Sequence, residues 1–220
     1  MSTKTRIHFT NVMEELNKEI LMMGVYVEEA LKKAIDALKN QDVNLAEEVI
    51  KEDERINALE IELFDKVAIV LATEQPVATD LRHLMGAIRI ITDLERAGDY
   101  AVHIAEGAVR LAGETYLTPL RQIPEAGDEA RQMLRDALTA FVNSDEGLAR
   151  EVAARDDILD KLHKKLLKKM LKYMNKDDEA DIEQATTLIS LARFLERLGD
   201  HVTNICEWVI YSKTGEHVEL

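Results

Sequence analysis

The sequence predicts an all-α protein built as a tandem repeat of two three-helix bundles, with six long helices in all. Three observations support this fold class. The 220 residues include only three prolines, nine glycines and few aromatic residues, a composition that favours helices and speaks against an all-β fold. Apolar residues recur at steps of three and four over long stretches. The sequences of two separate segments also recur, in similar form, roughly a hundred residues later.

The first half of the sequence predicts three helices. The first runs from residue 9 to about 39, because apolar residues line one face of that stretch. Asp42 can serve as the N-cap of the second helix. This helix should end near Gln75, since the residue before a proline disfavours the helical conformation. The third helix is expected from about 77 to 112.

The second half predicts three more helices, at about 125–143, 145–175 and 178–212. The segment "GETYLTPLRQIP", residues 113–124, separates the halves, because it interrupts the helical period and contains two of the three prolines. We therefore place the first three-helix repeat at residues 1–113 and the second at 119–220.

Internal repetition is visible in two places. "NQDVNLAEEV" at 40–49 matches "NSDEGLAREV" at 143–152, with six of ten positions identical at an offset of 103. "DLERAGDYAVHIAE" at 93–106 matches "FLERLGDHVTNICE" at 194–207 at an offset of 101. A duplicated three-helix unit explains both matches, because the offsets differ by only two residues. Each unit would bury an apolar helix face, and the two units could stack into an elongated molecule.

Acidic and amide side chains form pairs on four of the predicted helices. Members of each pair are four residues apart and therefore lie on one helix face. The pairs are Asp53 with Asn57, Glu95 with Asp99, Asp156 with Asp160, and Glu196 with Asp200.

The pairs of neighbouring helices should lie at the same height. If the second and third helices form an antiparallel hairpin turning at Pro76, Asn57 and Glu95 are each 19 positions from the turn. A hairpin turning at Asp178 gives the second half the same registry. The sequence therefore predicts that the pairs converge in each half.

Converging carboxylates need a positive counterpart, because two of them ~4 Å apart repel by roughly 4 kcal/mol at an effective dielectric constant near 20. Protons, neighbouring arginines such as Arg96 and Arg197, or bound cations can supply it. Oxygen ligands suit Mg, Ca, Mn or Fe, and the sequence does not exclude zinc as the bound metal. Gly98 and Gly199 immediately precede the aspartates of two pairs, where we interpret them as close helix crossings that also leave room for ligands.

Charge and motifs exclude several classes of protein. The formal net charge of −14 would repel phosphate backbones, so nucleic acid is not an expected partner. Cys206 is the only cysteine, which excludes an internal disulfide, and we interpret it as a core residue. The start "MSTKTRIHFT" lacks the apolar core of a secretory signal, and the longest apolar run, 67–72, is far shorter than the ~20 residues of a membrane span. We expect a cytoplasmic protein with no transmembrane segment.

The duplicated "LERAGD" and "LERLGD" elements, with "KEDERIN", "ARDDILD" and "DLRHL", give the chain a resemblance to the PhoU family of phosphate-signalling regulators over nearly its whole length. The resemblance implies a PhoU-like pair of three-helix bundles, each with acidic motifs on two helices. Some relatives hold multinuclear iron or other metal clusters there. It assigns metal binding to Asp53, Asn57, Glu95, Asp99, Asp156, Asp160, Glu196 and Asp200. Because Asn57 replaces a usual carboxylate, the first site is expected to hold its cation more weakly.

The resemblance also implies a function. Family members restrain the phosphate-starvation response when phosphate is plentiful, by linking the high-affinity phosphate ABC transporter to a membrane-bound sensor histidine kinase. The protein is accordingly expected to act from the cytoplasmic face of the membrane, to catalyse no reaction, and to form a homodimer.

Two other functions stay open at this point. A ferritin-like carboxylate-bridged di-iron oxidase also binds metal through helical carboxylates, but it needs Glu-x-x-His pairs on two helices. The nearest approaches here are Asp80 with His83 and Asp160 with His163. A passive helical scaffold with structural metals is the second alternative. The lysine-rich stretch 161–176 is interpreted as a bundle helix, with a docking or membrane-surface face as the alternative.

Overall fold

The computed structural model describes residues 3–174 and 179–220, and every regular element in those ranges is an α-helix, which confirms the predicted fold class. The helices are α1 (Thr3–Asn40), α2 (Val43–Glu74), α3 (Thr79–Arg110), α4 (Gln122–Asn143), α5 (Glu146–Ala153), α6 (Asp156–Tyr173) and α7 (Glu179–Thr214). The predicted turn residue Asp178 lies outside the described residues.

One predicted helix is wrong: the fifth, at 145–175, is divided into α5 and α6. Neither proline nor glycine stands at the break. Instead the backbone tightens there, since the Arg155 N–H bonds to the Val152 carbonyl and the Ile158 N–H bonds to the Arg155 carbonyl. The Arg155 guanidinium is also held by Glu129 and Asp136 of α4, at 2.7 and 2.6 Å. Contacts to another helix therefore fix a bend that helical periodicity does not reveal.

The helix caps repeat between the two halves. Asp42 accepts a hydrogen bond from the Leu45 N–H at 3.0 Å, which confirms the predicted N-cap of α2. Asp145 does the same for α5 through the Leu148 N–H, also at 3.0 Å. Gln75 ends α2 with φ 47°, in the left-handed region. The local chemistry that starts each second helix is thus duplicated with the rest of the unit.

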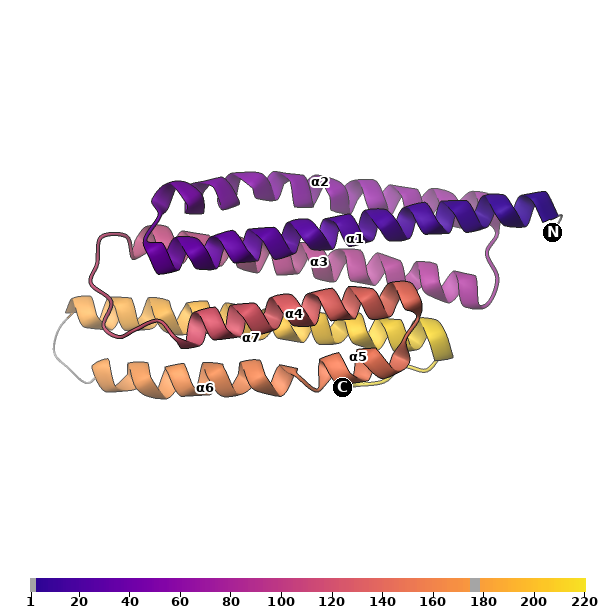
Figure 1. The fold of residues 1–220 in the computed structure, drawn as a ribbon. Helices are drawn as coiled ribbons and strands as arrows, with labels where there is room; N and C mark the ends of the chain where they lie inside the picture. The colour runs from indigo at the N-terminus through magenta and orange to yellow at the C-terminus, as the bar shows by residue number, and fades with distance from the viewer. Residues whose placement is uncertain (1–2, 175–178) are drawn as a thin grey trace.

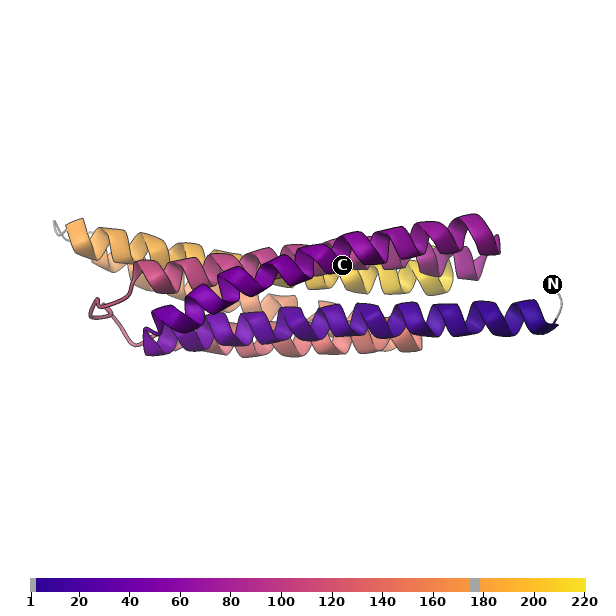
Figure 2. The same cartoon turned by 90° about the horizontal axis from the view of Figure 1, so that it is seen from above.

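The two halves pack side by side along their lengths (Figures 1 and 2). Helices α1, α2 and α3 pack on one another, and α7 packs on α4, α5 and α6. Between the halves, α3 packs against α7 and α1 against α4. Within the described ranges no helix has both the length and the hydropathy needed to cross a bilayer.

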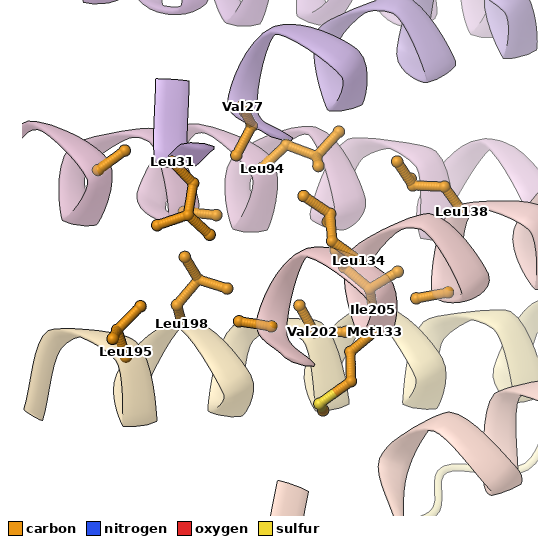
Figure 3. Close-up of a cluster of buried hydrophobic side chains, with 14 of the residues drawn as sticks. Val27, Leu31, Leu94, Met133, Leu134, Leu138, Leu195, Leu198, Val202 and Ile205 are labelled. Carbon is orange, nitrogen blue, oxygen red and sulfur yellow. The ribbon is translucent and has the colours of Figure 1, made fainter. Parts of the chain in front are cut away.

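One hydrophobic core joins the halves. Val27 and Leu31 of α1 and Leu94 of α3 face Leu134 of α4 and Leu198 of α7, and all five side chains are fully buried (Figure 3). Burial on this scale is the main force that holds the two units together.

Cys206 lies in the same core, as predicted. Burial raises the pKa of its thiol to about 12, so the reactive thiolate is scarce at neutral pH. Cys206 is therefore a small apolar filler of the core.

Glycines allow α1 and α4 to cross closely at two equivalent points. A Cβ on Gly24 would lie 2.1 Å from the Leu138 side chain, and one on Gly127 would lie 1.8 Å from the Ile35 side chain. Gly24 and Gly127 are 103 residues apart, as are Ile35 and Leu138. The halves therefore meet through a pseudo-twofold contact that comes from the duplication itself.

Candidate metal centres

All eight predicted ligands lie on the helix pairs that the sequence placed together. Asp53 and Asn57 are on α2, and Glu95 and Asp99 are on α3, which packs against it. The other set has the same arrangement on the neighbouring helices α6 and α7. We call the four residues on α2 and α3 the first acidic set. The second acidic set comprises Asp156, Asp160, Glu196 and Asp200.

The second acidic set concentrates negative charge at Asp156. The pKa of Asp156 is raised to about 6, first by burial and then by the charges of Asp200, Asp160 and Glu196. Burial also raises the pKa of Asp200; Asp160 adds to this, while His201 and Arg197 oppose it. The four carboxylates therefore act on one another across the two helices, as the predicted registry requires.

In the first acidic set, burial and neighbouring carboxylates also raise pKa values, but by less than at Asp156. Burial raises the pKa of Asp53, the hydrogen bond from Asn57 lowers it, and the charge of Asp99 raises it. Burial raises the pKa of Glu95 as well, with Asp99 the next cause and Arg96 opposing. The amide of Asn57 adds a donor where a carboxylate would add charge, which explains the difference between the sets.

Three oxygens at these positions lack partners. Oδ1 of Asp53, Oδ1 of Asn57 and Oδ1 of Asp156 are buried and have no hydrogen-bond partner among the described residues. Buried acceptors are normally satisfied, so each can accept a ligand that the polypeptide does not provide. Two of the three occupy equivalent positions in the repeat, at an offset of 103.

Gly98 and Gly199 make room for these aspartates. A Cβ on Gly199 would lie 2.3 Å from Asp156 Oδ1, and one on Gly98 would lie 3.4 Å from Asp53 Oδ1. Each glycine therefore provides both the close helix crossing and the space for an acidic oxygen. The fit is tighter in the second half, where an added methyl group would displace the carboxylate.

Four of the carboxylates, those of Asp53, Glu95, Asp99 and Asp160, are engaged with protein groups. The Asn57 amide donates to Asp53 Oδ2 at 3.0 Å, and Arg96 pairs with Glu95 at 3.5 Å and with Asp99 at 3.1 Å. Lys164 pairs with Asp160 in the second set. Accordingly, across residues 3–174 and 179–220, no three His, Cys, Asp or Glu side chains already form a group that could hold a metal ion. Metal binding would require these side chains to turn away from their present partners.

A group of polar and aromatic side chains lies between α3 and α7. The sequence did not predict this group as a site. His201 Nδ1 lies 2.8 Å from Oδ1 of the buried Asp93, which joins the two halves. The Phe194 ring stacks near Tyr100 and His103, with centroid distances of 6.0 and 4.9 Å. Only one sequence signal was available, namely that Tyr100 and His201 occupy equivalent repeat positions beside Asp99 and Asp200.

We predict that the metal-free protein depends on pH through Asp156. Its pKa in the folded chain, about 6, is above the ordinary value of 3.8. Its stabilising contribution is therefore complete below about pH 4 and is lost as pH rises through about 6. Because the side chain is only partly buried, solvent screening reduces the effect to on the order of 1 kcal/mol. Asp156→Asn should remove this part of the pH dependence in urea unfolding with chelator present.

The control for this prediction is Asp157→Asn, because the Asp157 side chain is 77% exposed. It should change the difference in unfolding free energy between about pH 5 and pH 7.5 much less than Asp156→Asn does, because the Asp157 charge is the smallest of the four charges that raise the pKa of Asp156. An Asp156→Asn variant with the same pH dependence as the wild type would contradict the prediction.

Comparisons with known proteins identify relatives over nearly the whole chain. The family model described as the PhoU domain matches residues 20–108 and again 123–209. The phosphate-specific transport system accessory protein PhoU homolog of Clostridium acetobutylicum is 39% identical over 98% of this chain and 99% of its own. The homolog of Aquifex aeolicus is also 39% identical, over 94% and 93%. The crystal structure of PhoU from Pseudomonas aeruginosa superposes with a TM-score of 0.89 at 34% identity, covering 94% of this chain and all of that one.

Proposed function

The chain belongs to the PhoU family, and from this premise we propose that it is a regulator of phosphate uptake and signalling. In this proposal it serves a phosphate-specific transport system as an accessory protein, restrains the phosphate-starvation response, and couples the phosphate ABC transporter to a sensor histidine kinase. It acts from the cytoplasm, as a homodimer, and catalyses no reaction. The observation that carries the proposal is the match to accessory proteins of phosphate transport along 98% of the chain.

We also propose that the two acidic sets bind divalent or trivalent cations, either singly or as a multinuclear iron cluster. Three buried oxygens without partners and the mutual repulsion at Asp156 support this assignment. A bound cation would supply positive charge that offsets the repulsion and ties together the two helices of each hairpin. The second acidic set should bind metal before the first acidic set does, because Asn57 gives the first set a neutral ligand in place of a carboxylate.

The contacts of His83 do not support the di-iron oxidase alternative, for which Asp80 with His83 is one of the nearest approaches to a Glu-x-x-His pair. His83 lies 3.0 Å from Asn17 Oδ1 and stacks on Phe141 with a centroid distance of 4.6 Å. Burial lowers the pKa of His83, which keeps the ring neutral at this interface between helices. These contacts favour a structural role for His83. Oxygen consumption with ferrous iron would favour the oxidase, and metal dependence of stability alone would favour the passive scaffold.

The regulatory role is tested by deleting the gene in its host. Phosphate-responsive transcription should rise in phosphate-rich medium, because the restraint on the response is lost. Reintroducing the wild-type chain should restore repression. A deletion strain that represses normally in phosphate-rich medium would contradict the proposal, whatever metal the purified protein holds.

A further inference from the structure

An apolar face lies exposed on the half of α2 that leads toward the α2–α3 turn. Ile61 and Phe64 of α2 are 65% and 43% exposed. Ile61 and Phe64 line a hollow of about 290 Å³ together with the acidic residues Glu60 and Asp65. We call these four residues, Glu60, Ile61, Phe64 and Asp65, the acidic face. Several large apolar side chains exposed at one place mark an interaction surface more often than a single exposed one does.

The equivalent part of α6 carries the opposite charge. At an offset of 103, Lys164 and Lys168 occupy the positions of Ile61 and Asp65. Leu171 follows on the same helix and is 50% exposed. We call the following residues the basic face: Lys164, Lys168, Leu171 and Lys172.

The duplication shows that the fold does not require either of these surface chemistries. Helices α2 and α6 use the same buried positions, since Leu63 and Leu166 are equivalent and both are at most 1% exposed. On the solvent side, however, Ile61 corresponds to Lys164. Helical packing is satisfied with either residue, so the exposed isoleucine needs an explanation outside the monomer.

Charge decides what fits the acidic face. A second acidic face would place Glu60 and Asp65 against carboxylates, and an anionic lipid surface would be repelled in the same way. A surface with apolar side chains between lysines is complementary to it, and the chain itself carries one. The two faces lie toward opposite ends of the molecule, since α2 meets α3 at the right of Figure 1 while α6 ends at the left.

We propose that the acidic face of one copy packs on the basic face of a second copy, in an antiparallel twofold dimer that forms this contact twice. Leu171 would enter the hollow beside Ile61 and Phe64, with Lys168 and Lys172 next to the carboxylates of Glu60 and Asp65. Twofold symmetry makes the contact reciprocal, because each copy contributes one face of each kind. The inference rests on the homodimer of the proposed function and gives it a surface.

A reciprocal exchange of residues tests the pairing. Variant one, Ile61→Lys with Asp65→Lys, gives α2 the residues of α6. Variant two, Lys164→Ile with Lys168→Asp, gives α6 the residues of α2. Each substitution introduces a residue that the other copy of the same helix already carries, so folding should be preserved, and circular dichroism checks this.

Sedimentation velocity and native mass spectrometry of the full chain provide the readout. The wild type, 24.9 kDa as a monomer, should dimerise. Each variant alone should dimerise at least about 100-fold more weakly, because apolar burial is lost and like charges meet at both contacts. An equimolar mixture should restore a dimer that contains one chain of each variant. The wild-type dimer should also weaken as salt rises.

Three results would overturn the proposal. They are a wild type that stays monomeric, variants that dimerise as tightly as the wild type, and a mixture in which no mixed dimer forms. Head-to-tail chains that grow with concentration would likewise exclude the closed twofold arrangement. None of these results bears on repression by phosphate, so failure here is distinguishable from failure of the regulatory proposal.

Discussion

Replacing the four carboxylates of the second acidic set with alanine is expected to abolish metal binding by the second half. The variant is Asp156→Ala, Asp160→Ala, Glu196→Ala and Asp200→Ala. Helix content should be unchanged, because none of the four side chains belongs to the shared hydrophobic core. Metal analysis after purification without chelator, together with titration of Fe²⁺ or Mn²⁺, measures the loss.

The same variant should change stability in opposite directions with and without metal. Without metal, removing four mutually repelling carboxylates raises the unfolding free energy, as the raised pKa of Asp156 indicates. With metal at about 100 times its dissociation constant, the wild type gains about 2.7 kcal/mol that the variant cannot gain.

The matched control removes the first acidic set instead, through alanine at Asp53, Asn57, Glu95 and Asp99. It should lose less bound metal, because Asn57 leaves that site one carboxylate short. Equal metal content in the wild type and the second-half variant would reject the assignment of these residues as ligands.

Leu134→Ala should destabilise both halves of the chain in a single transition. Leu134 is fully buried in α4 and lies in the core that also contains Leu31 and Leu94 of the first half. A buried leucine reduced to alanine costs about 2–5 kcal/mol, through lost burial and the cavity that remains. Denaturant unfolding should show this loss with an unchanged slope, because the unfolded and folded states expose the same surface as before.

Two probes separate cooperative unfolding from independent unfolding. Far-ultraviolet circular dichroism reports on all the helices, whereas the single tryptophan, Trp208 of α7, reports on the packing around its own ring, where the Arg89 guanidinium of α3 lies 5.2 Å away. The two transitions should coincide. Met22→Ala is the control, since Met22 is 49% exposed, and it should change the unfolding free energy by no more than about 0.5 kcal/mol. Two separate transitions would mean that the halves are independent domains.

The positions of the acidic residues follow from local rules. A spacing of four residues places Asp156 and Asp160 on one helix face whatever the helix packs against. Equal distances from a hairpin turn place them level with Glu196 and Asp200. Burial is the main cause of the raised pKa of Asp156, and the charges of Asp200, Asp160 and Glu196 add to it, which agrees with that registry.

The partners of these side chains could not be predicted in the same way. Lys164 pairs with Asp160, and Arg96 pairs with Glu95 and Asp99, because long flexible side chains choose among several neighbours of similar energy. The Asp93–His201 contact joins residues 108 apart and depends on how α3 and α7 pack. Nothing in the period of either helix specifies it.

By itself, the sequence determined the helical fold class, the N-cap at Asp42, and the pairing of α2 with α3 and of α6 with α7. These features depend on hydrophobic period, turn residues and duplication, which act over short separations. The tertiary structure alone decided that the halves share one core, that the helix after Asp145 bends at Arg155, and that the acidic face and the basic face lie toward opposite ends of the molecule. Each of those depends on contacts between distant segments, whose geometry is set by side-chain packing and not by periodicity.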